Sequence, residues 1–261
     1  MITPVTTQGR IQSLLAASFF GLIALLTSAL FSQVNSQPAK ILVGAAASLQ
    51  PVLQELMPPQ QVTYTFAASG VLQRQIEQGA PIDLFISASI TQMNELERQQ
   101  LLVPGSKSVL VTNRMVLISP RKSPKPLTDF RQLVRPEIKL IAIAEPRTAP
   151  AGQYATEVLQ NLDILAQVKS KLVLGNNARA TLTAVETGNA DAGIVYLTDA
   201  RRSDQVMIGA IADQKLHAPI IYAIAIVRST KSLAAAHKYL QFLRSDSAIK
   251  VFEQYGFKAK N

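Results

Sequence analysis

Two similar stretches, GAAASLQPVLQEL at residues 44–56 and TFAASGVLQRQIEQG at residues 65–79, decide the fold of this chain. In each, a strand-like segment runs into a serine, Ser48 or Ser69, that opens an amphipathic helix. The first turn of a helix has unpaired N–H groups and a partial positive charge, so it can hold an anion without lysine or arginine. Taken alone, each serine is more simply a helix cap. Together, the two predict one anion site.

Short apolar strands alternate with amphipathic helices throughout the chain after its first 39 residues, which predicts parallel sheets covered by helices. A breaker-rich segment, SPRKSPKPLTDF, separates two such series, and the late strand IIYAIAIV follows the second. We therefore predict an α/β fold with two lobes, each built on a doubly wound sheet, joined by strands that cross between them around a ligand cleft. The expected division is 40–119 plus 225–261 for lobe I and 120–224 for lobe II.

Residues 1–39 read as a targeting segment and not as part of the fold. They contain no acidic residue, and Arg10 precedes an uncharged apolar run from Leu14 to Phe31. That run is longer than most signal-peptide cores and slightly shorter than most membrane spans. A cleaved signal peptide and an uncleaved N-terminal anchor both fit, and small residues favour cleavage near Ser36. Either predicts an exported, periplasmic protein.

The composition excludes several classes of function. The chain has no cysteine, so it has no disulfide framework, thiol nucleophile or lipid-attachment cysteine. The net charge of +9 fits a nucleic acid, an anionic membrane or a small anion as partner. Only one aromatic residue, Phe130, falls within the loosely spaced basic group at residues 121–139, too few for a nucleic-acid platform, so we interpret this group as a solvated surface and expect no nucleic-acid binding. That group contains Arg121, Lys122, Lys125, Arg131, Arg135 and Lys139.

The second half supplies two more helix starts. In TAPAGQYATEVLQNL, Pro150 suits a first helical turn and Gly152 lets the backbone approach a ligand. In GNNARATLTAVETGNADAGIVY, Asn176 or Asn177 can cap a helix that ends at Gly188. The four helix starts can face one cleft or belong to four ordinary helices, and both readings stay open at this point.

Five stretches, in this order along nearly all of the chain after residue 40, resemble the periplasmic molybdate-binding proteins of ATP-driven importers, which have the type II periplasmic binding protein fold. They are AAASL, FAASG with the following RQIEQGAPIDLFISAS, PAGQYA, NNARATLTAVETGNADAGIVYLTDA and FEQYGF. The resemblance implies an ABC permease and its ATPase as partners, a monomeric receptor without a cofactor, and molybdate or tungstate as ligand.

The same resemblance implies the binding residues. In that family, two serine hydroxyls, backbone N–H groups of the second lobe and a tyrosine hydroxyl hold the oxyanion. These positions correspond to Ser48, Ser69, Ala151, Ala178 and Tyr196. Molybdenum would then be bound as its oxyanion, with no protein side chain ligating the metal directly and no catalytic residue.

The residue types fit a tetrahedral dianion that only accepts hydrogen bonds. Ala151 and Ala178 can offer only main-chain N–H groups, and Tyr196 ends the apolar strand GIVY, where its hydroxyl can reach the cleft. Ala178 replaces a larger aliphatic residue, and Ser89 stands where the family commonly has Asp. Arg147 is a further departure, because a cation near the cleft rim would change the on-rate or the anion preference.

Three alternatives compete with this interpretation. The ligand could be another tetrahedral oxyanion, such as sulfate or phosphate. Ser48 or Ser69 could be the nucleophile of a serine-dependent enzyme, but there is no GxSxG elbow, and His217 and His237 have no evident carboxylate partner. A transcriptional effector domain is disfavoured, because the chain carries an export segment and no DNA-binding motif. We expect no enzymatic activity.

Overall fold

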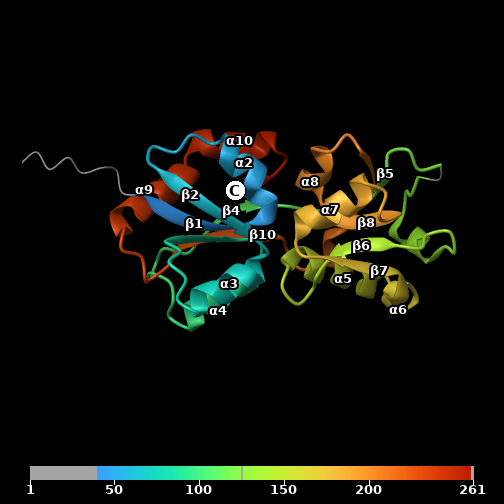
Figure 1. The fold of residues 1–261 in the computed structure, drawn as a ribbon, viewed down its shortest axis with the longest axis horizontal. Helices are drawn as coiled ribbons and strands as arrows, with labels where there is room; N and C mark the ends of the chain where they lie inside the picture. The colour runs from blue at the N-terminus through green and yellow to red at the C-terminus, as the bar shows by residue number, and fades with distance from the viewer. Residues whose placement is uncertain (1–39, 125, 260–261) are drawn as a thin grey trace, which may run out of the picture. The chain divides into compact units, whose positions relative to one another are not determined.

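Two mixed β-sheets, each with helices on both faces, form the part of the chain that the computed structural model describes, residues 40–124 and 126–259 (Figure 1). These residues belong to one compact unit. The predicted signal peptide or anchor at residues 1–39 lies outside the described residues. In the described part, no helix is both long enough and apolar enough to cross a membrane.

The first sheet combines a parallel half with antiparallel strands. Strand β1 pairs in parallel with β2 and β3, whereas β10 runs antiparallel to β3 and β4, and β11 runs antiparallel to β4. The order is β11-β4-β10-β3-β1-β2, with bounds β1 Ile41–Ala46, β2 Val62–Ala67, β3 Leu84–Ser87, β4 Ser108–Thr112, β10 Ile221–Ile226 and β11 Lys258–Ala259.

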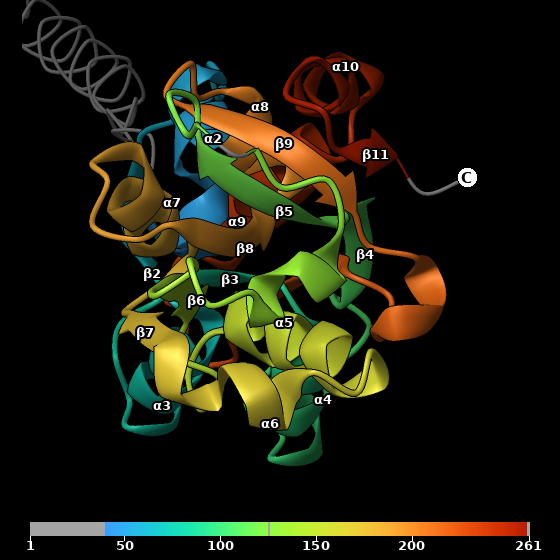
Figure 2. The same ribbon diagram turned by 90° about the vertical axis from the view of Figure 1, so that its right-hand side faces the viewer.

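The second sheet repeats this plan with five strands, which Figure 2 shows from β9 at the top to β7 at the bottom. Strand β6 is parallel to β7 and β8, and β5 is antiparallel to β8 and β9. The order is β7-β6-β8-β5-β9, with bounds β5 Met115–Pro120, β6 Ile141–Ala144, β7 Leu172–Gly175, β8 Ala192–Tyr196 and β9 Val206–Ile211. The predicted α/β class is confirmed, but the sheets are not purely parallel.

Helices cover both faces of each sheet, as Figure 1 shows. On the first sheet, α3 and α4 lie on one face and α2, α9 and α10 on the other; on the second, α7 and α8 lie opposite α5 and α6. Their bounds are α2 Gln50–Glu55, α3 Ser69–Glu77, α4 Ile90–Arg98, α5 Pro150–Asn161, α6 Leu165–Val168, α7 Ala178–Glu186, α8 Leu197–Arg201, α9 Leu233–Leu243 and α10 Asp246–Gln254. Short 3-10 helices are η1 Ala47–Leu49, η2 Phe130–Val134, η3 Lys169–Lys171 and η4 Gln214–Leu216.

The apolar periodicity of the helices accounts for the core. Leu72 and Ile76 of α3 pack with Met93 of α4 against Phe85 of β3. All residues of the central strands β3, β6 and β8 are buried, as expected for strands covered on both faces. The sheets are therefore held by side chains that the sequence places at helical or continuous apolar spacing.

The chain changes sheet close to the expected lobe boundaries, but not at them. It passes from β4 to β5 through Asn113 and Arg114 only, so β5 belongs to the second sheet. It returns between β9 and β10, so all of β10 belongs to the first sheet. The breaker-rich segment SPRKSPKPLTDF begins within the last two residues of β5, so it lies after the crossover and not at it. A two-residue crossover within apolar strands has no breaker residues to mark it.

Helix α5 starts almost in contact with the end of β6, and Gly152 makes this approach possible. A Cβ atom added there would lie 2.1 Å from the carbonyl oxygen of Ala144. The helix carries Pro150 as its first residue, and its apolar face includes Tyr154 and Val158. Glycine is therefore required to place this helix start against the strand.

We expect Gly152→Ala to lower the free energy of unfolding by about 3 kcal/mol, because the added methyl group overpacks the contact between helix and strand. Denaturant unfolding measures the change. Gln160→Ala, an exposed change on the same helix, serves as the control and should be nearly neutral. A Gly152→Ala protein as stable as the wild type would contradict the close approach.

Candidate functional site

The five predicted binding residues all line one cavity, with a volume of about 210 Å³ including its open mouth. Both sheets contribute to its wall. From the first come Ala46, Ala47, Ser48, Ala67, Ala68, Ser69 and Ala88; from the second come Ala149, Pro150, Ala151, Asn177, Ala178 and Tyr196. None of these residues has a charged side chain.

Four helical segments begin at this cavity. Ser48 lies in η1 directly after β1, and Ser69 is the first residue of α3 directly after β2. Ala151 is the second residue of α5, and Ala178 is the first residue of α7. N–H groups in a first turn have no partner within the helix, so the wall presents several main-chain donors together with the positive ends of helix dipoles. The four helix starts therefore face one cavity, a question that the sequence alone did not decide.

The two serines do not cap their helices, which corrects the simplest interpretation of each. The capping positions are Ala46 and Ala68, and neither helix start has a side-chain cap. Each serine lies inside its helical segment, so its hydroxyl turns to other partners. Ser48 Oγ lies 2.8 Å from the Tyr222 hydroxyl, and Ser69 Oγ accepts a hydrogen bond of 3.0 Å from the Ala88 N–H.

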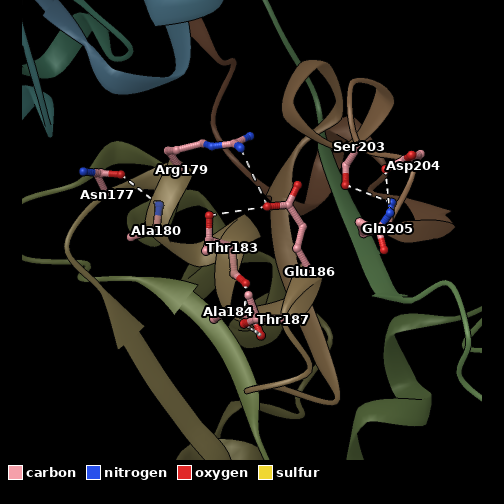
Figure 3. A network of polar contacts seen from close by, with 10 residues as sticks. All are labelled: Asn177, Arg179, Ala180, Thr183, Ala184, Glu186, Thr187, Ser203, Asp204 and Gln205. Atoms are coloured by element: carbon pink, nitrogen blue, oxygen red, sulfur yellow. Dashed lines mark hydrogen bonds and ion pairs between the residues drawn. The ribbon is translucent and has the colours of Figure 1, made fainter.

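The start of α7 is capped as predicted (Figure 3). Asn177 Oδ1 accepts a hydrogen bond of 3.0 Å from the N–H of Ala180, which fixes the backbone around Ala178. On the same helix, an Arg179 guanidinium nitrogen lies 3.7 Å from a Glu186 carboxylate oxygen. Ser89 likewise caps α4, accepting from the N–H of Thr91.

Tyr196 offers a hydroxyl that the rest of the structure does not use. It ends β8 and is 1% exposed, and its hydroxyl has no hydrogen-bond partner among the described residues. Burial is the main reason that its pKa lies well above the ordinary value of 10.0. The group is therefore a neutral donor at the wall of the cavity, 5.9 Å between ring centroids from Tyr222.

Arg147 does not lie on the cavity. Its side chain is 86% exposed and pairs with Glu145 at 3.1 Å. The pairing lowers the pKa of Glu145, mainly through the hydrogen bond from Arg147. Glu145 partly neutralises the charge of Arg147. Because Arg147 is also not among the residues that line the cavity, it has no direct contact through which it could change anion binding.

Asp199 is a site-adjacent residue that the sequence analysis missed. Only 5% of it is exposed, and its Oδ2 atom has no hydrogen-bond partner among the described residues. Burial raises the pKa of this carboxyl to about 7, although Arg179 and Arg202 oppose the rise. These three side chains share a second pocket that touches the cavity at Ala47. A single Asp between Thr198 and the basic pair Arg201 and Arg202 gives no sequence signal of burial.

The side chains that line the cavity are small or neutral. Neither His217 nor His237 lines it. In the part of the chain that the structure describes, no group of three or more His, Cys, Asp or Glu side chains could hold a metal ion. The arrangement can desolvate a small acceptor-rich ligand between two sheets and bind it through neutral donors.

Such a donor-lined cavity between two α/β lobes is the arrangement expected of a receptor that binds a small solute. The model of the family described as "Bacterial extracellular solute-binding protein" matches residues 41–258, and the chain belongs to this family.

Individual relatives and solved structures are described by the ligand that they bind. The molybdate-binding protein ModA of Haemophilus influenzae is 38% identical over 232 residues, 85% of this chain and 91% of that protein. The periplasmic molybdate-binding protein of Azotobacter vinelandii has a TM-score of 0.77 at 23% identity, covering 85% of this chain and 100% of that one. The sulfate-binding protein SubI of Mycobacterium tuberculosis has a TM-score of 0.74 at 18% identity, covering 85% and 88%. These two structures share the fold.

We expect Asp199→Asn to stabilise the protein more at about pH 8 than at about pH 5. The unfolded carboxyl titrates near 3.8 and the folded one at about 7, so between these values the folded state holds a proton that the unfolded state has lost. This group's contribution to stability therefore falls as the pH rises through that window. Asparagine has no such titration.

Melting temperatures of both proteins at the two pH values measure the difference. Asp246→Asn, at an exposed position in the first turn of α10, is the control. A difference between Asp199→Asn and wild type that stays constant with pH, or that reverses sign, would contradict the raised pKa.

Proposed function

We propose that this protein binds molybdate or tungstate in the cavity and delivers it to an ABC permease driven by its ATPase. One observation carries the proposal: Ser48, Ser69, Ala151, Ala178 and Tyr196, far apart in the sequence, line one cavity without a charged side chain. The similarity to molybdate-binding ModA over most of both chains supports the choice of ligand.

The donor set suits a fully deprotonated tetrahedral dianion. Molybdate, tungstate and sulfate present only acceptors at neutral pH, whereas hydrogen phosphate also carries a proton that needs an acceptor. No carboxylate lines the cavity to accept such a proton. Discrimination against the smaller sulfate would then depend on the size of the closed cavity.

Closure of two lobes around the anion would remove it from water. The N–H of Gly70 in α3 already donates a 2.9 Å hydrogen bond to the carbonyl oxygen of Thr148, just before α5. This bond joins the two sides of the cavity wall. We propose that opening it admits the anion, and that the closed form is presented to the permease in the periplasm by a monomeric receptor.

Residues 1–39 are proposed to direct export of the chain. The family consists of extracellular proteins, which supports this role. Mass spectrometry of the exported protein distinguishes a cleaved signal from an anchor: a mass that begins near residue 37 supports cleavage, and one that begins at Met1 opposes it.

Isothermal titration of the purified protein with molybdate, tungstate, sulfate and phosphate tests the proposed function directly. Tight binding of the first two alone supports it. Binding of sulfate instead would keep the receptor class and change the ligand, and the shared fold of SubI makes this the second candidate. No binding of any of the four would contradict the proposal.

The double variant Ser48→Ala plus Ser69→Ala should weaken molybdate binding by roughly 2 to 6 kcal/mol, taking about 1 to 3 kcal/mol for each donor lost to a charged ligand. Calorimetry measures the change. Ser119→Ala is a matched control, because Ser119 is 1% exposed, has no hydrogen-bond partner for its hydroxyl among the described residues and lies outside the cavity. Unchanged affinity in the double variant would remove both serines from the site.

A further inference from the structure

The hydroxyl of Ser48 is tied to a residue that no part of the proposed site includes. Tyr222 lies in β10, is fully buried and does not line the cavity. Its hydroxyl oxygen lies 2.8 Å from Ser48 Oγ, and its ring packs 5.9 Å from that of Tyr196. Tyr222 therefore touches two of the five candidate binding residues from behind the cavity wall.

A second residue fixes the surroundings of the Tyr222 hydroxyl. Asn113 lies in the crossover between β4 and β5, and its Oδ1 atom accepts a 2.9 Å hydrogen bond from the N–H of Arg114. This bond sets the orientation of the amide. Its Nδ2 group then donates to Thr198 Oγ1 at 2.9 Å and, at a longer 3.5 Å, to the Tyr222 oxygen.

These contacts decide which hydroxyl donates. An amide Nδ2 group has hydrogens to give and no lone pair to accept, so it cannot take the Tyr222 proton. Of the two groups hydrogen-bonded to the Tyr222 hydroxyl oxygen, Asn113 Nδ2 and Ser48 Oγ, only the serine oxygen can accept. A buried hydroxyl proton without an acceptor is costly, so Tyr222 donates to Ser48. The hydrogen of Ser48 is then left over.

We propose that Tyr222, supported by Asn113, is a positioning residue that turns the hydroxyl hydrogen of Ser48 toward the bound oxyanion. The inference rests on the proposed function, because it concerns how the same cavity holds its ligand. Ser48 is nearly buried and lines the cavity, so its hydrogen points to the ligand once Tyr222 occupies an acceptor position. The donor chain runs from Asn113 through Tyr222 and Ser48 to the anion.

This chain also gives the site a preference between anions. A protonated oxyanion needs an acceptor for its own hydrogen. A Ser48 hydroxyl that is held as a donor would instead place its hydrogen against the hydrogen of the ligand, which disfavours binding. Without the Tyr222 hydroxyl, Ser48 can rotate and accept. Tyr222 would therefore favour fully deprotonated oxyanions without touching them.

A double-mutant cycle tests the inference by isothermal titration of the full-length protein with molybdate. Tyr222→Phe keeps the buried ring but removes the hydroxyl that orients Ser48. It should therefore weaken molybdate binding about ten-fold. In a Ser48→Ala background, Tyr222→Phe should cause almost no further loss. Equal losses in both backgrounds, or no loss in either, would overturn the proposal.

Tyr239→Phe is the matched control. Its hydroxyl is likewise buried, bonded to the hydroxyl of Tyr64 at 2.7 Å, and Tyr239 lies outside the cavity. It should change the melting temperature without changing the affinity for molybdate. An equal loss of affinity in this control would reduce the effect of Tyr222→Phe to general destabilisation and overturn the proposal.

Asn113→Asp provides a second variant if Tyr222→Phe does not fold. It keeps the acceptor for the Arg114 N–H but replaces the Nδ2 donor with an acceptor, so Tyr222 should donate to Asp and Ser48 to Tyr222. The resulting loss of affinity should be smaller in a Ser48→Ala background, where only the effect of the added charge remains. A loss of the same size in both would count against the donor chain.

Wild-type protein that does not bind molybdate refutes the proposed function. Wild-type protein that binds it, combined with an additive cycle, refutes only the role of Tyr222.

Discussion

A cavity without charged side chains can stabilise a dianion only through dipoles that are already in place. Each neutral N–H or O–H donor contributes modestly, and its contribution grows when water is excluded and the donor need not reorient. The starts of η1, α3, α5 and α7 meet this demand, because the fold fixes their N–H groups before any ligand arrives. The rest of the structure depends on bringing these four starts together.

The sheets bring them together by presenting the ends of their strands to the same space. Strands β1 and β2 run in parallel and are each followed directly by a helical start at the cavity. Alanine dominates the wall, and a methyl group covers little of the backbone, so the N–H groups stay accessible. Gly152 acts differently in α5, where the missing side chain lets the helix start lie almost in contact with the end of β6. Small residues are thus a requirement of binding through the main chain.

The sequence predicted the local parts of this arrangement better than their assembly. Helical spacing located α3, α5 and α7, Asn177 is the cap that its side chain suggested, and Tyr196 ends its strand as expected. These features depend on residues close in sequence. The two serines are not caps, because each lies one or two residues beyond the capping position, inside its helical segment. The sequence pattern does not locate a helix start to within one or two residues.

The sequence pattern did not predict contacts between residues that are far apart in the chain. The bond between Ser48 and Tyr222 joins positions 174 residues apart, and nothing near either residue signals it. The same holds for Asp199, whose raised pKa comes from burial by the whole assembly. The crossover at Asn113 was hidden because two apolar strands flank it.

These long-range contacts are also where two receptors with the same wall can differ. A main-chain N–H is present whatever the side chain, so a wall of alanines and helix starts can be common to sites with different ligands. The buried groups behind it are specific to each sequence. In this protein, Tyr222 and Asn113 set the direction of the Ser48 hydroxyl, and Asp199 places an ionisable group beside the wall. Selectivity in such a site is therefore to be sought one layer behind the atoms that touch the anion.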